Sequence, residues 1–98
     1  MQRDILFYQA NFEPEVCRML DALEKNDEKY FAFFKIKTIK IVDEILKISK
    51  SWVEKEEWSA IKNIVQDAEF ATEQMKNVLR NFGNPFSVKF AHLQIKNA

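Results

Sequence analysis

Residues 27–53 read DEKYFAFFKIKTIKIVDEILKISKSWV, and this stretch decides the fold. Its apolar side chains recur at alternating steps of three and four residues, the spacing of one helix face. The β-branched residues between positions 35 and 41 would also suit a strand, but no turn-forming residue lies near them, so the longer helical period prevails. We therefore expect a helix over residues 28–50, with a stripe made of Phe31, Phe34, Thr38, Ile41, Ile45, Ile48 and Trp52.

A second stripe with the same spacing follows and predicts a helix over residues 52–82. It consists of Trp58, Ile61, Val65, Ala68, Thr72, Met75, Leu79 and Phe82. The two stripes are out of register, because six residues separate Trp52 from Trp58. Ser51 and Glu54 form a capping-box pattern, which favours the start of a new helix. The pattern indicates an antiparallel helical hairpin, with one continuous helix as the alternative.

The stretch around these stripes lacks the two residues that most often interrupt regular structure. Between Pro14 and Gly83 lie 68 residues without a glycine or a proline. A sheet protein of this size would need several tight turns, whereas helices need only caps. The sequence thus predicts an all-α protein, a small antiparallel bundle of three to four helices built on a long central hairpin, with residues 1–98 as a single helical domain.

The two ends of the chain are less regular. Pro14 suits the first turn of a helix over residues 14–25, which leaves residues 1–12 as an arm, a short helical turn or an edge strand. At the other end Gly83 can adopt the left-handed conformation that ends a helix, and Asn84 can cap the next. We expect that last helix over residues 85–96, although residues 86–90 also alternate like a strand.

Charge and cysteine content exclude several classes of protein. The chain carries 15 basic and 15 acidic residues, which argues against nucleic-acid binding. Net charges of −3, +3, −2 and +2 for residues 1–27, 28–53, 54–82 and 83–98 suit antiparallel elements packed side by side. Cys17 is the single cysteine, so no internal disulfide forms, and neither a signal peptide nor a membrane span is apparent. We expect a cytoplasmic protein.

No motif in the chain carries catalytic or metal chemistry. Cys17 and His92 could form a nucleophile–base pair, but no glycine-rich elbow or oxyanion-hole loop accompanies them. A cysteine on a helix beside apolar residues usually fills space. Glu69 and Glu73 share a helix face, yet no histidine follows either at the spacing of a bundle metal site. We expect no enzyme activity, no cofactor and no metal site.

The aromatic residues instead favour an interaction surface. The chain has nine phenylalanines, more than a thin bundle readily buries. Phe70 lies off the apolar stripe and could form a docking patch with later phenylalanines, or be covered by the last segment. The leading hypothesis is a small non-catalytic interaction module of adaptor, inhibitor or regulator type that binds a protein partner or forms a homodimer. Its candidate interface residues are Phe70, Phe86, Phe90, Trp52 and Trp58.

A second hypothesis comes from the lysines of the first long helix. They form a basic edge that an anionic lipid surface could use, although Asp43 and Glu44 interrupt it. The edge consists of Lys37, Lys40, Lys47 and Lys50. The alternative function is therefore an amphipathic-helix binder of an anionic lipid surface or of a small apolar ligand.

Overall fold

Helices account for most of residues 4–96, the part of the chain that the computed structural model describes. That part contains no strand, which confirms the all-α prediction and settles residues 86–90 as helix. The elements are α1 (Ile5–Glu24), α2 (Glu28–Ile48), α3 (Trp52–Gln66), the 3₁₀ turn η1 (Ala68–Phe70), α4 (Glu73–Phe82) and α5 (Asn84–Lys96).

Short polar side chains fix where four of the helices begin. Asp4, Asp27, Ser51 and Thr72 each accept a hydrogen bond from the backbone N–H three residues later, at 3.0, 3.2, 3.3 and 3.2 Å. Each bond satisfies an N–H group that has no partner inside the helix, which stabilises the helix start by about 1 kcal/mol. Helices therefore begin after these residues without any glycine or proline.

Helices α2 and α3 form the antiparallel hairpin, which rules out the single continuous helix. Residues 49–51 are not helical, and Ser51 caps α3 as the sequence predicted. One ion pair joins the two helices, Lys62 of α3 to Asp43 of α2 at 2.6 Å, and a second joins Lys35 of α2 to Glu69 of η1, which follows α3, at 3.0 Å. The partners approach in reverse sequence order, as two antiparallel helices require.

Helix α1 begins at Ile5, nine residues before the predicted start at residue 14. Of the three alternatives for residues 1–12, an arm, a short helical turn or an edge strand, residues 5–12 are helical as part of α1, while residues 1–3 lie outside the described part. Pro14 lies inside the helix, where its missing N–H leaves the carbonyl of Ala10 without a helical donor. The Ser87 hydroxyl donates a hydrogen bond to that carbonyl at 3.1 Å. A tertiary contact therefore supplies the hydrogen-bond donor that the proline lacks.

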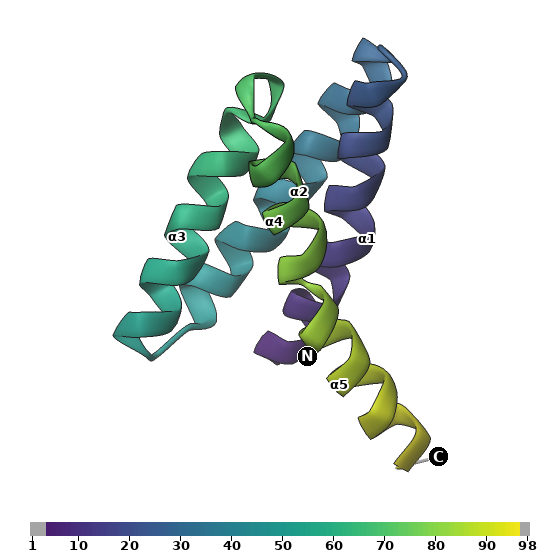
Figure 1. Cartoon of the computed structure of the whole chain (residues 1–98). Coiled ribbons are helices and arrows are strands. Elements are labelled where there is room, and N and C mark those ends of the chain that lie inside the picture. Colours follow the sequence, from purple (N-terminus) through teal and green to yellow (C-terminus); the bar gives the residue numbers. More distant parts are fainter. Residues whose placement is uncertain (1–3, 97–98) are drawn as a thin grey trace.

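The predicted helix over residues 52–82 is two helices separated by η1. Helix α3 ends at Gln66, and Thr72 caps α4 instead of contributing to the apolar stripe. This break redirects the chain, so that α4 lies across α1 (Figure 1). Arg80 of α4 then pairs with Asp21 at 3.3 Å and with Glu24 at 2.6 Å.

The elements form two layers (Figure 1). Helices α1 and α2 make one layer, and α3 and α4 cover one face of it. Helix α5 continues from α4 along the first half of α1, where Phe90 contacts Phe7, and its far end points away from the bundle. On the opposite face of the α1–α2 layer, no helix of residues 4–96 covers Tyr30 and Phe33, which are more than half exposed.

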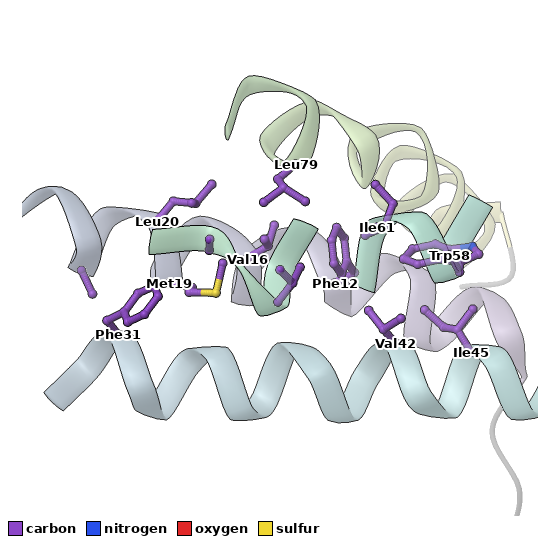
Figure 2. Packing of buried hydrophobic residues seen from close by; sticks show 13 residues of the cluster. Phe12, Val16, Met19, Leu20, Phe31, Val42, Ile45, Trp58, Ile61 and Leu79 are labelled. Carbon is purple, nitrogen blue, oxygen red and sulfur yellow. The ribbon is translucent and has the colours of Figure 1, made fainter. Parts of the chain in front are cut away.

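The core lies between the two layers (Figure 2). Trp58 is completely buried at one end of the core, and its ring lies 5.2 Å from Phe12, 4.8 Å from Phe82 and 5.6 Å from Phe86. Burial of such a cluster is the main stabilising term for a chain of this size. The other fully buried large residues are Met19, Leu20, Ile45, Leu79, Val16, Val42 and Val65.

Gly83 has a different role from the predicted one. Its φ of −79° is right-handed, so it is not a left-handed cap, and α5 begins at Asn84, directly after it. A Cβ at position 83 would lie 2.8 Å from Cβ of Glu13, closer than real Cβ atoms approach. Glycine is therefore needed for the close packing of the α4–α5 junction on α1. The left-handed residue is Asn26, with φ 58°, in the α1–α2 turn.

Candidate functional site

The structure separates the five aromatic candidates into three groups. Trp58 belongs to the core and is not available to a partner. Phe86 and Phe90 are half-buried, the first against Trp58 and the second 6.2 Å from Phe7. Phe70 is 85% exposed and Trp52 is 73% exposed.

Of the two alternatives for Phe70, the patch with Phe86 and Phe90 does not form, because those two rings pack beside Trp58 and Phe7. The last segment packs on α1 and does not cover Phe70 either, because the Ser87–Ala10 hydrogen bond holds α5 against the opposite half of the bundle. Phe70 lies on η1 as an isolated exposed side chain, a common feature of protein surfaces.

A cluster that the sequence analysis missed lies on the outer side of α2. Tyr30, Phe33 and Ile36 are 54%, 52% and 57% exposed within two turns of the same helix. The signal was a second stripe with steps of four and three residues, opposite the buried one. It runs through Lys29, Phe33, Ile36, Lys40, Asp43 and Lys47, all exposed, and the sequence analysis considered only its lysines at positions 40 and 47, as part of the basic edge.

Two of these side chains, Tyr30 and Phe33, pack on Phe34. The ring of Phe34, which is half-buried between α1 and α2, lies 6.2 Å from Tyr30 in a stacked arrangement and 5.2 Å from Phe33 edge to face. The ammonium of Lys37 lies 5.2 Å above the Phe33 ring. Such contacts restrict the rotamers, so the rings present a partly ordered surface to a partner.

A groove runs beside this cluster along the seam between α1 and α2, and we call it the α1–α2 groove. It consists of two depressions. One, of about 440 Å³, is lined by Arg18, Asp21, Ala22, Lys25, Asp27, Tyr30 and Phe34. The other, of about 300 Å³, is lined mainly by apolar atoms of Phe7, Tyr8, Asn11, Glu15, Lys37, Lys40 and Ile41.

The acidic groups of the groove already have cationic or backbone partners. Oε1 of Glu15 accepts from Arg18 at 2.8 Å and lies 3.9 Å from Lys37, while Oε2 is buried without a hydrogen-bond partner in the described part of the chain. Asp21 pairs with Arg80, and Asp27 caps α2.

Two of the basic groups of the groove have no such partner. Within residues 4–96, neither Lys25 nor Lys40 takes part in an ion pair. Of the four lysines of the predicted basic edge, Lys37 and Lys47 have acidic partners, whereas Lys40 and Lys50 have none among the described residues. The groove therefore carries uncompensated positive charge.

Cys17 and His92 lie in different surroundings. Cys17 is half-buried on α1 beside Arg80, and its burial raises the pKa of the thiol, an effect that the positive charge of Arg80 only partly offsets. His92 is exposed on α5 and is not among the groups that act on the thiol. A raised pKa leaves little thiolate at neutral pH, which does not favour a nucleophilic role.

The remaining chemistry-bearing residues act within the fold. Glu69 pairs with Lys35, and Glu73 pairs with Lys76 at 3.3 Å. Among the described residues no group of three or more histidine, cysteine, aspartate and glutamate side chains could hold a metal ion. No described helix has both the length and the apolar character that a membrane span requires.

No protein-family model, curated protein or solved structure has significant similarity to the chain. The function must therefore be argued from the surface of the molecule.

Proposed function

We propose that the chain is a small non-catalytic module that binds protein surfaces, a second copy of itself included, through apolar side chains on its helices. The observation that carries the proposal is the exposed cluster of Tyr30, Phe33 and Ile36 on α2. Scattered apolar residues are normal on a surface, but three large ones in two turns of one helix are typical of a contact site.

The energetics support this reading. Complete burial of a side chain such as phenylalanine or isoleucine stabilises by about 1.5–3 kcal/mol relative to exposure. Phe33 and Ile36 are about half exposed, so a partner that covered both would recover about 2 kcal/mol. Aromatic anchors of this kind dominate the affinity of many interfaces.

Sedimentation velocity of the wild type from low to high micromolar concentration tests self-association. We expect a concentration-dependent dimer that the double variant Phe33→Ser, Ile36→Ser weakens without loss of helicity in circular dichroism. Val88→Ser, which changes an exposed side chain on α5, is the matched control. A wild type that stays monomeric at high micromolar concentration would contradict self-association.

A parallel variant separates the two exposed sites. Phe70→Asp changes the isolated ring on η1, 85% exposed, and it should weaken association if Phe70 contributes to the interface. Unchanged association would remove Phe70 from the interface and leave α2 as the contact site.

One observation favours an anionic lipid surface as a second candidate. Lys29 and Lys40 have no ion pair among the described residues, and both share the outer stripe of α2 with Phe33 and Ile36. Lysines around exposed apolar residues suit binding at a membrane interface. Co-sedimentation with phosphatidylserine vesicles, weakening as salt is added, would support this function; equal binding to neutral vesicles would argue against it.

A further inference from the structure

We propose that the α1–α2 groove binds an amphipathic helix of another protein, and that this helix carries acidic residues near both of its ends. The inference rests on the proposed interaction function and goes further by naming the site and the chemistry of its occupant.

The shape of the groove supports a helical occupant. Its two depressions lie along one interhelical seam, and apolar side chains line both, with Tyr30 and Phe34 in one and Phe7, Tyr8 and Ile41 in the other. The seam between two packed helices is the place where the side chains of a third helix fit.

The length of the groove sets the length of the partner helix. The lining residues run from Asp27 to Ile41 on the α2 side and from Phe7 to Lys25 on the α1 side. At 1.5 Å per residue these stretches are about 21 Å and about 27 Å long, which corresponds to about four to five turns of a partner helix.

The charges specify the ends of the partner. Lys25 lines the depression near the α1–α2 turn, and Lys40 lines the other depression. Because the acidic groups of the groove are engaged by Arg18, Arg80 and the start of α2, these two lysines remain for a partner. Glutamate or aspartate in the first and last turns of such a helix would face them, with apolar residues between.

The described part of a second copy does not offer such a helix, because the exposed outer stripe of α2 carries Lys29, Lys40 and Lys47 against a single acidic residue, Asp43, and is therefore basic. Helix α3 buries its apolar stripe in the core, and α4 has one acidic residue, Glu73, at its start, followed by Lys76 and Arg80. Helix α5 contains no acidic residue. The charges of the α1–α2 groove therefore fit a helix of a different protein, whereas self-association uses the outer stripe of α2.

A fluorescent amphipathic peptide of about 15 residues is the probe. The peptide has leucine at positions i, i+3, i+4, i+7 and i+8 and two glutamates in each terminal turn. In a charge-reversed control peptide, lysines replace these glutamates. We expect anisotropy to show binding of the acidic peptide and at least tenfold weaker binding of the control. Lys40→Glu should weaken the acidic peptide by about five- to tenfold, because one attraction becomes a repulsion. Tyr30→Ser should weaken both peptides.

The matched control is Lys55→Glu, which reverses an exposed lysine on α3 that has no ion pair among the described residues. It should leave the affinity unchanged. The inference is overturned if the charge-reversed peptide binds as tightly, if Lys40→Glu has no larger effect than Lys55→Glu, or if phosphatidylserine vesicles bind and the acidic peptide does not. Self-association in sedimentation without peptide binding would overturn the inference alone, and absence of both would overturn the proposed function as well.

Discussion

Replacement of Gly83 by alanine tests the packing of the α4–α5 junction on α1. The backbone at this position is right-handed, so alanine meets no conformational strain and should gain about 0.4–1 kcal/mol from the unfolded state. The new Cβ, however, would lie 2.8 Å from Cβ of Glu13 and 3.1 Å from its Cα and N. Two of these three atoms are backbone, which cannot move aside as a flexible side chain would.

The steric cost in the folded state should therefore exceed the gain from the unfolded state. Overpacking of this kind costs about 1–3 kcal/mol, so the net loss of stability should be about 1–2 kcal/mol. For a chain of this length that corresponds to a fall in Tm of about 5–15 °C, measured by circular dichroism at 222 nm. A Gly83→Ala variant as stable as the wild type, or more stable, would refute the reasoning.

Two backgrounds at position 13 show whether the cause is the contact with Glu13. Glu13→Ala keeps the Cβ atom, so Gly83→Ala should cost the same there as in the wild type. Glu13→Gly removes the nearest atom, so the cost of Gly83→Ala should fall by about 1 kcal/mol in that background. Equal costs in both backgrounds would place the strain elsewhere.

Three further predictions follow from burial and charge. In a Trp52→Phe variant the remaining fluorescence comes from the buried Trp58, so the emission should be blue-shifted and poorly quenched by acrylamide; red-shifted emission would place Trp58 in water. Trp58→Ala should lower the free energy of unfolding in urea by about 3–5 kcal/mol. Iodoacetamide should modify Cys17 slowly at neutral pH and faster as the pH rises, since burial raises the pKa of its thiol; a folded rate equal to that in urea would contradict this. The pKa of Glu69 is lowered by a hydrogen bond from its own backbone N–H and then by Lys35. The wild type should therefore be more stable than Glu69→Gln at neutral pH, and this difference should disappear as the pH falls through the lowered pKa. A difference that grew in acid would contradict a lowered pKa.

Local patterns predicted the helices that local interactions determine. Ser51 and Glu54 marked the α2–α3 turn, and the stripe through Phe31 and Ile45 marked the buried face of α2. Both signals act over one or two helical turns, so they could be recognised from neighbouring residues alone.

The missed features depend on contacts between distant residues. Pro14 is tolerated inside α1 because Ser87 donates to the carbonyl that it frees, and Gly83 is needed because Glu13 lies against it. Thr72 fitted the apolar stripe by position, but its hydroxyl caps α4. In each case a partner far along the chain, or a competing local hydrogen bond, decided the outcome.

The candidate surface was partly predictable. Phe70 and Trp52 were interface candidates, and both are exposed, although Trp52 was also assigned to the apolar stripe and Phe70 could have been covered by the last segment. The cluster at Tyr30, Phe33 and Ile36 was missed because α2 has apolar residues around much of its circumference, and only the placement of α1 and α3 determines which of them are covered. The groove between α1 and α2 depends on the same placement.

The contacts of α1 with α4 and α5 also bear on the order in which the protein can fold during synthesis. The ribosome delivers α1 before α4 and α5, but the face that carries Cys17 is completed only by Arg80, Gly83 and Ser87, which lie more than 60 residues later in the sequence. The hairpin of α1 and α2 can form early from contacts close in sequence, whereas the Ala10 carbonyl can accept its hydrogen bond from Ser87 only after α5 has been synthesised. A nascent chain that stalls before α4 would thus expose an apolar face of its first helix to chaperones.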